Sequence, residues 1–415
     1  MKPDLAVIIK QIVDEYEEGQ SNTYTLHDRG IDMLRNTYEL LLIGTVLMGC
    51  SGKDDGDESV DDTALGDTDT DTDTDTDTDD TDTDTDTDTD DTDPVPEVDE
   101  VYSAPTFAVE LRSDEVYGQG QTHSNWNIEA PEPEVMDLKL DLYVPDNDDT
   151  QRPLVVFTHG GGWSGGDKAG DNETAFCNFF ATRGFVCASL NYRLRGDYGT
   201  VPQAYFDAVT ATEGITPEEA SQVLSMYPAG RDCKAAVRWL VANASDIGFN
   251  VGAISLIGGS AGAHNSIVMD VSEPEDYRDE LSLTEDPTLA LTNMDVEYDI
   301  QAVVNHWGGA GMMQILGDVY GHDRFDSTDA PLLIVHGTAD LTSDYTNAQE
   351  LENIYNTNGV HNDLVPLQDA GHGAWGFEFD DGTTFPELSF DFDGTTLPEL
   401  SFAFITAKLG LDVVD

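Results

Sequence analysis

The sequence predicts an α/β fold in which a mostly parallel central sheet carries helices on both faces. Short apolar runs with the composition of buried strands recur along the chain, at Leu154–Thr158, Phe185–Leu190, Ala253–Ile257, Ile300–Val304 and Pro331–Val335. Helix-compatible stretches, such as Asp232–Asn243, lie between several of these runs. The alternation favours parallel pairing, because each helix returns the chain to the same edge of the sheet.

Further strands are indicated on either side of this pattern. Leu138, Leu140 and Leu142 alternate with polar residues, which is typical of a strand with one buried face. The run Leu364–Leu367 follows the last of the five buried strands and extends the series toward the C-terminus.

Composition limits the classes of function. The 415 residues carry 83 acidic and 18 basic side chains, for a formal net charge of −65. Nucleic-acid binding rests on Lys and Arg that neutralise phosphates, so we expect no nucleic-acid partner. No apolar run reaches the roughly 18–20 residues that a membrane-spanning helix needs. The four cysteines are too few for a disulfide scaffold.

An apolar run, Leu40–Met48, leads directly into Gly49 and Cys50. Its length suits a signal-peptide core, and its ending resembles a bacterial lipobox, in which the cysteine receives the lipid. A chain that starts at Met33 reaches Cys50 at an ordinary signal length. We therefore expect residues 1–32 to be an over-extended N-terminus and residues 33–50 to be a lipoprotein signal peptide. The alternative is a short buried helix followed by an ordinary cysteine.

Residues 51–100 form an acidic segment that becomes nearly pure Asp-Thr alternation from Asp67 onward. Because its charges repel and it has little apolar surface to bury, we expect a disordered, extended linker. Calcium binding by its carboxylates is the alternative. Residues 101–415 are expected to form one globular domain. Near its end a twelve-residue unit occurs twice, at Asp381–Phe392 and Asp393–Phe404, and we expect one copy to pack as the closing helix.

The strongest chemical signal is the sequence Gly-Gly-Ser-Ala-Gly around Ser260, directly after the strand Ala253–Ile257 and before a helix-compatible stretch. Such a motif alone is weak, but the strand-turn-helix context is what a nucleophile on a tight turn requires. Glycines permit that turn, and the N–H groups at the start of the following helix suit developing negative charge.

A second signal, His159-Gly-Gly-Gly-Trp163, ends the strand Leu154–Thr158. Glycines let backbone N–H groups approach a reacting carbonyl and stabilise its oxyanion. The alternatives are a flexible loop or a phosphate cradle. A phosphate loop would end in Lys followed by Ser or Thr, which this stretch does not.

An acid and a base are expected after the serine, in that order. Asp340 lies just beyond the strand Pro331–Val335, and His372 lies 32 residues later in the chain. Asp340 would orient His372, which would take the proton of Ser260. Asp344 is the alternative acid. The remaining candidates have structural interpretations: His336 as a turn residue, His264 on the helix after the serine, and His322 and His361 in polar loops.

With these residues in place, the chain resembles the α/β-hydrolases of the acetyl-esterase and carboxylesterase group over about residues 115–410. The resemblance rests on Leu140–Pro145, His159–Lys168, Asn191–Leu194, Ala235–Leu240, Ser260–Gly262 and His336–Asp340. It implies an oxyanion hole formed by Gly161, Gly162 and the N–H of Ala261. It also implies a catalytic triad of Ser260, His372 and Asp340 that needs neither a metal nor an organic cofactor.

The long segment Arg195–Gly230 departs from this family pattern and is the part best placed to overhang Ser260. It mixes aromatic and acidic residues, which suits stacking on sugar rings at an open site. The alternative is that its aromatic residues simply pack the segment onto the sheet. Among the cysteines, Cys177 and Cys187 are predicted on a helix and a strand in adjacent layers roughly 10 Å apart, beyond the ~7 Å disulfide limit. We therefore favour buried thiols for both and for Cys233.

These observations predict a lipid-anchored serine esterase of the cell envelope, at the outer membrane or the cell surface. Its expected partners are a small-molecule or polysaccharide ester and, through the lipid alone, a membrane. Short acyl esters are the expected substrates, including acetylated or feruloylated polysaccharide. A peptidase or amidase on the same fold is one alternative, and a non-catalytic binding module displayed at the surface is another. The oligomeric state stays open.

Overall fold

A computed structural model describes residues 98–126, 133–373 and 396–415, all of which belong to one compact unit. The predictions for residues 1–32, the signal peptide with Cys50, and the acidic linker up to residue 97 fall outside these residues. So does the first copy of the repeated unit, Asp381–Phe392.

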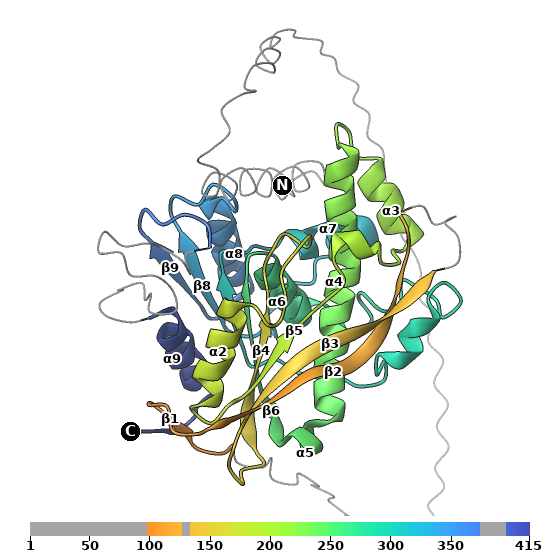
Figure 1. Cartoon of the computed structure of the whole chain (residues 1–415). Helices are drawn as coiled ribbons and strands as arrows, with labels where there is room; N and C mark the ends of the chain where they lie inside the picture. Colours follow the sequence, from red (N-terminus) through yellow and green to blue (C-terminus); the bar gives the residue numbers. More distant parts are fainter. Residues whose placement is uncertain (1–97, 127–132, 374–395) are drawn as a thin grey trace, which may run out of the picture. The chain divides into compact units, whose positions relative to one another are not determined.

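The described residues form an eight-stranded sheet that confirms the predicted fold class (Figure 1). Its order is β2 (Val109–Thr122), β3 (Glu134–Pro145), β5 (Val186–Leu190), β4 (Arg152–Thr158), β6 (Phe249–Gly259), β7 (Ala302–His306), β8 (Leu332–Gly337) and β9 (Asn362–Leu367). From β5 to β9 all neighbours are parallel, whereas β3 is antiparallel to both β2 and β5. Every strand predicted from an apolar run is present. A separate parallel pair joins β1 (Val101–Tyr102) to β10 (Val413–Val414).

Helices cover both faces of the sheet, as predicted. The side chains of β4 show why: Leu154 and Val156 belong to one apolar cluster, and Val155 and Phe157 belong to a second cluster on the other face. The second cluster is closed by α2 (Asp171–Ala181) and α9 (Leu397–Leu409). The first is closed by α3 (Gln203–Thr210), α4 (Pro217–Ala242), α6 (Ala261–Val271), α7 (Gly311–Tyr320) and α8 (Tyr345–Asn358).

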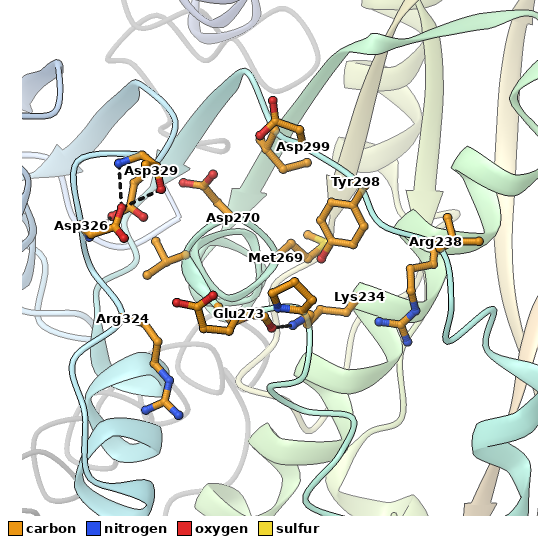
Figure 2. A pocket seen from close by; sticks show the side chains of 16 residues that line it. Lys234, Arg238, Met269, Asp270, Glu273, Tyr298, Asp299, Arg324, Asp326 and Asp329 are labelled. Atoms are coloured by element: carbon orange, nitrogen blue, oxygen red, sulfur yellow. Dashed lines mark hydrogen bonds between the residues drawn. The ribbon is translucent and has the colours of Figure 1, made fainter. Parts of the chain in front are cut away.

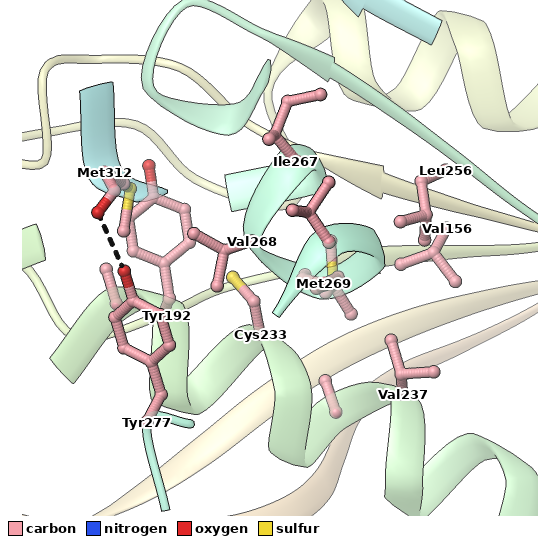
Figure 3. Packing of buried hydrophobic residues seen from close by; sticks show 14 of the residues in the cluster. Val156, Tyr192, Cys233, Val237, Leu256, Ile267, Val268, Met269, Tyr277 and Met312 are labelled. Carbon is pink, nitrogen blue, oxygen red and sulfur yellow. Dashed lines mark hydrogen bonds between the residues drawn. The ribbon is translucent and has the colours of Figure 1, made fainter. Parts of the chain in front are cut away.

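The core beneath α6 is densely apolar (Figure 3). Ile267 and Val268 of α6 belong to the same buried cluster as Val156 and Leu256 of the sheet and Val237 of α4. This packing fixes the helix that follows Ser260. Two short helices complete the topology on this side, α5 (Ala244–Ile247) after α4 and the 3₁₀ helix η3 (Pro287–Leu291) before β7.

Helix α4 begins at Pro217, well before the predicted start at Asp232. Thr216 caps it by accepting a hydrogen bond from the N–H of Glu219, whose side chain in turn accepts from the N–H of Thr216. Most of α4 is buried, so its apolar pattern is not confined to one stripe. That explains why periodicity alone placed its start too late.

The segment Arg195–Gly230 contains the 3₁₀ helix η2 (Arg195–Asp197), α3 and the first half of α4. Within this segment Tyr205, Met226 and Tyr227 are almost completely buried in the core. For these three the alternative interpretation is therefore right, and they pack the segment onto the sheet. Tyr198 differs, because it remains partly exposed.

Helix α9 is formed by the second copy of the repeated unit and the residues after it. Thr396 caps the helix by accepting a hydrogen bond from the N–H of Glu399. Leu397, Phe402 and Phe404 pack into the apolar cluster with α2. The second copy thus closes the fold, as expected of one of the two.

The prediction of buried thiols is wrong for Cys177 and Cys187, which form a disulfide. Cys177 does lie on α2 and Cys187 on β5, but their Cα atoms are only 5.2 Å apart. The prediction failed because the layer spacing relates the helix axis to the mean plane of the sheet, whereas the Cα atoms of these two cysteines lie on the facing sides of α2 and β5. Cys233 is a buried free thiol, as predicted.

Candidate active site

Ser260 lies on a sharp turn between β6 and α6 with backbone angles φ 55° and ψ −122°. A non-glycine residue with positive φ is strained, and such strain persists only where the surroundings enforce it. Here the enforcement comes from both sides of the turn. The N–H of Ser260 donates to the carbonyl of His306 at 2.9 Å, and α6 is anchored in the core below.

Glycines make this turn possible because the backbone around Ser260 lies very close to the end of β4 and to the loop that follows it. A Cβ atom at Gly262 would collide with the carbonyl oxygen of Thr158, and one at Gly258 would collide with that of Gly262. A Cβ atom at Gly160 would lie 2.8 Å from the carbonyl oxygen of Gly259. The glycines of the two predicted motifs therefore interlock and hold the loop after β4 against the serine.

The structure brings Ser260, His372 and Asp340 into one hydrogen-bonded chain. Nε2 of His372 lies 3.0 Å from Oγ of Ser260, and its Nδ1 lies 2.8 Å from Oδ2 of Asp340. The side chain of His372 is 22% exposed, whereas that of Asp340 is fully buried. A substrate can thus reach the serine and the imidazole while the acid stays shielded.

The loops after β8 and β9 hold the acid and the base together. The N–H of Thr338 donates to the carbonyl of Leu367 at 2.9 Å, and that of Ala339 donates to the carbonyl of Ala370 at 3.0 Å. A Cβ atom at Gly337 would collide with the carbonyl oxygen of Ala370. Strand pairing therefore continues into the loops and sets the separation of Asp340 from His372.

Asp340 is built to remain ionised. Burial alone would raise its pKa, but hydrogen bonding to His336 and His372 outweighs burial and lowers the pKa of Asp340 far below its usual value. Its Oδ1 also accepts hydrogen bonds from the N–H groups of Thr342 and Ser343, at 2.8 and 2.9 Å. An ionised carboxylate at this position stabilises the imidazolium that forms when the histidine takes a proton.

His336 is not the turn residue predicted from the sequence. It lies within β8, is fully buried, and approaches Oδ2 of Asp340 to 3.4 Å through Nε2. The same Nε2 lies 2.7 Å from the carbonyl oxygen of Ser343, so it must carry the proton. Sequence reasoning missed this support for the acid. The only signal was that His336 directly continues the apolar run Pro331–Val335.

The alternative acid lies elsewhere. Asp344 caps α8, where its Oδ1 accepts a hydrogen bond from the N–H of Thr346 at 2.8 Å. His264 lies on α6 as expected, and burial lowers its pKa to about 4. His322 and His361 are exposed between secondary-structure elements. Among the carboxylates of the described residues, only that of Asp340 is hydrogen-bonded to His372.

The loop after β4 carries Gly161 and Gly162, which were predicted to contribute to an oxyanion hole, and it lies beside the serine. Gly161 and Gly162 both have positive φ, at 105° and 57°, which turns the backbone back on itself. Within the described part of the chain, neither of their N–H groups donates to another protein group. The N–H of Ala261, the first residue of α6, is likewise without an intrahelical acceptor.

Neighbouring groups hold this loop in place. Tyr192 donates its hydroxyl to the carbonyl of His159 at 2.9 Å and stacks on the His159 ring. The N–H of Arg195 donates to the carbonyl of Trp163 at 2.7 Å. The Trp163 indole is buried and directs its N–H toward Oδ1 of Asn265 on α6 at 3.5 Å. The loop is therefore fixed before any ligand arrives, which oxyanion stabilisation requires.

This arrangement can perform nucleophilic acyl transfer. His372 is placed to accept the proton of Ser260, and the N–H groups nearby can receive the negative charge that develops on a carbonyl oxygen. The described residues contain no group of three or more metal-ligating side chains that could hold an ion. In the same residues no helix is both long and apolar enough to cross a membrane.

A cavity of about 230 Å³ lies at the C-terminal end of α6 (Figure 2). Charged side chains line it, including Lys234, Arg238, Asp270 and Asp329. Burial raises the pKa of Asp329 to about 7 and lowers the pKa of Lys234 to about 7. Because Ser260 lies at the other end of α6, this cavity is separate from the triad.

Comparisons with known proteins find similarity to esterases. A family model described as BD-FAE matches residues 140–221 and 219–324. The isoprenylcysteine alpha-carbonyl methylesterase ICME of Arabidopsis thaliana is 26% identical over 275 residues, which cover 59% of this chain and 58% of that protein. Carboxylesterase NlhH of Mycobacterium tuberculosis is 31% identical over 134 residues, or 32% of this chain and 33% of that protein. The chain thus spans about a third to somewhat over half of these relatives' length.

Two solved structures of esterases are similar to part of this chain. Esterase Est2 of the Planctomycetes species Thermogutta terrifontis, bound to propionate, is 21% identical with a TM-score of 0.47, covering 73% of this chain and 94% of that one. A truncated carbohydrate esterase from gut microbiota is 18% identical with a TM-score of 0.46, covering 75% of this chain and all of that one.

Proposed function

We propose that this protein is a serine carboxylic-ester hydrolase in which Ser260 is the nucleophile. The observation that carries the proposal is the hydrogen-bonded chain from Oγ of Ser260 through His372 to the buried Asp340. The names of the similar curated proteins, a methylesterase and carboxylesterases, support an ester rather than another acyl bond.

The geometry supports the following mechanism. His372 takes the proton from Ser260 as Oγ attacks the ester carbonyl, and Asp340 stabilises the imidazolium. The N–H groups of Gly161, Gly162 and Ala261 receive the oxyanion. Collapse of the tetrahedral intermediate expels the alcohol, which takes its proton from His372. Water, activated by the same histidine, then releases the acid from the acyl-enzyme.

The proposal includes short acyl groups, such as acetate, on a polysaccharide or other bulky alcohol. It is tested with nitrophenyl acetate, butyrate and palmitate, and with a matched acetanilide for the amidase alternative. We expect the two short esters to be cleaved at least tenfold more efficiently than palmitate, and the amide not at all. Efficient amide cleavage would favour the amidase. Failure to cleave every compound would favour a binding module.

We further propose that the mature protein is lipid-anchored at Cys50 in the cell envelope, at the outer membrane or the cell surface. The disulfide between Cys177 and Cys187 supports an oxidising compartment outside the cytoplasm. Mass spectrometry of the native membrane fraction should find an acylated N-terminus at Cys50. Recovery of intact peptides from residues 1–32 would contradict both the Met33 start and the processing.

A further inference from the structure

A cleft of about 380 Å³ lies at the end of β2, formed by β2, the segment after β5 and the loop between α6 and η3. We call it the Trp126 cleft. The residues that matter for its chemistry are Gln121, His123, Trp126, Tyr198, Thr200 and Leu281.

The Trp126 cleft lies at the same edge of the sheet as Ser260. Strand β2 is antiparallel to β3, which is antiparallel to β5, so β2 runs in the same direction as β6. The C-terminal ends of β2 and β6 therefore share one edge. Four strand spacings separate them in the sheet order, which at about 4.8 Å each gives about 19 Å across the sheet. Strand β2 also extends further along the strand direction than β6, because the register places Glu115, and not Gln121, level with Gly258. One sugar unit with its acetyl group cannot bridge that span, but an oligosaccharide can.

A continuous path of contacts joins the cleft to the oxyanion loop. The backbone carbonyl of Trp163 accepts a hydrogen bond from the N–H of Arg195. Two residues later, the backbone carbonyl of Asp197 accepts one from the N–H of His123 at 3.1 Å. Arg193 donates to the carbonyl of Gln121 at 2.8 Å. The segment that carries Tyr198 is therefore fixed both to the catalytic loop and to the end of β2.

The walls of the cleft suit a neutral ring that carries hydroxyl groups. Trp126 and Tyr198 meet edge to face, with ring centroids 5.4 Å apart, and both side chains are partly exposed. None of the described residues lining the cleft is Lys or Arg, and Glu285 is their one carboxylate. Aromatic faces stack on sugar rings, whereas an anionic ligand would require cationic partners.

Hydrogen bonds fix the polar groups in advance. Thr200 donates to Oε1 of Gln121 at 3.0 Å, so its oxygen accepts from Nε2 of His123, also at 3.0 Å. Gln121 is 6% exposed, and no described residue accepts a hydrogen bond from its Nε2. Trp126 is held by a hydrogen bond from its indole N–H to Oγ of Ser221 at 2.6 Å. The cleft thus offers an aromatic ring that is held by a hydrogen bond and, on Gln121, an amide N–H group that donates to no described residue.

We propose that the Trp126 cleft is a distal subsite for a sugar unit of a neutral esterified polysaccharide, several units from the ester at Ser260. This proposal rests on the proposed esterase function. It makes cleavage depend on the length of the sugar chain, because only chains that reach both sites gain the binding energy of the cleft.

The test measures kcat/KM for acetylated xylo-oligosaccharides of increasing length, with nitrophenyl acetate as a substrate too short to reach the cleft. For the wild type, kcat/KM should rise once the chain spans both sites. In the Trp126→Ala variant, kcat/KM for the long oligomers should fall about tenfold. Its kcat/KM for nitrophenyl acetate should stay within about twofold of the wild-type value. Tyr102→Ala removes a partly exposed aromatic residue on β1, outside the cleft, and should leave both rates unchanged.

A binding measurement separates the two proposals. In Ser260→Ala, unesterified xylo-oligosaccharide should change the tryptophan fluorescence, and this change should vanish in the Ser260→Ala/Trp126→Ala double variant. Absence of binding, or a rate independent of chain length, would overturn the subsite while leaving the esterase proposal standing. If Trp126→Ala lowered kcat/KM for nitrophenyl acetate as much as for the long oligomers, Trp126 would have a structural role, and the subsite proposal would also be overturned. Binding without hydrolysis by the wild type would retain the subsite and contradict the esterase.

Discussion

Asp340 lies 2.8 Å from Nδ1 of His372 through its Oδ2 atom, and it is fully buried while the histidine is partly exposed. The two residues come from the loops after adjacent parallel strands, β8 and β9, and the ladder between these strands continues into hydrogen bonds between the loops. This proposed catalytic pair, whose members are separated by 32 residues in the chain, is thus positioned by the pairing of two strands.

Asp340→Asn should lower esterase kcat by about 10⁴-fold, because an amide cannot stabilise the imidazolium and favours the wrong tautomer. Asp344→Asn is the matched control. It keeps a good capping residue on α8 and should retain near-normal activity. Steady-state kinetics on nitrophenyl acetate checks both variants. Loss of activity in Asp344→Asn alone would identify Asp344 as the acid.

Gly262→Ala should destabilise the fold by about 1–3 kcal/mol and abolish activity, because the added methyl group collides with the Thr158 carbonyl and displaces the loop after β4. Gly196→Ala is the control, since a Cβ atom there meets nothing within 4 Å. Urea unfolding and kinetics provide the measurement. If the two variants have the same stability and activity, the requirement for glycine at position 262 does not come from the close approach of β4 to α6.

Removal of the disulfide between Cys177 and Cys187 should cost about 2–3 kcal/mol, the chain-entropy value for a loop of this size. Reductant should lower the melting temperature of the wild type and should have no effect on the Cys177→Ala/Cys187→Ala variant. Alkylation of the unfolded, unreduced protein should leave both cysteines unmodified in peptide mass spectra. Alkylation of both would contradict the bridge.

The free energy of unfolding should fall between about pH 4 and pH 7. Burial raises the pKa of Asp329 from 3.8 to about 7, so in this range the folded state holds a proton that the unfolded state has lost. Asp329→Asn should flatten this fall. Asp412→Asn, which changes an exposed carboxylate, should not. Urea titrations at a series of pH values test this, and parallel curves for Asp329→Asn and wild type would refute it.

Much of this architecture could be predicted from the sequence. The apolar runs predicted the buried strands. The glycines around Ser260 and after His159 predicted turns in which backbones approach too closely for a side chain. Strand β2 escaped prediction because Leu111 and Val116 are exposed on an edge strand whose register shifts twice. The supporting role of His336 depends on how the loop after β8 turns back toward that strand, and the bridge at Cys177 depends on the distance between a helix and the sheet. Periodicity encodes neither.

The most direct test of the account is active-site labelling with a fluorophosphonate, followed by peptide mapping. We expect one stoichiometric adduct on the peptide that contains Ser260, none in Ser260→Ala, and greatly slowed labelling in His372→Ala, since nucleophile and base act as a unit. A folded protein that takes up no label, or takes it up equally well without Ser260, would contradict the assignment of Ser260 as a catalytic nucleophile.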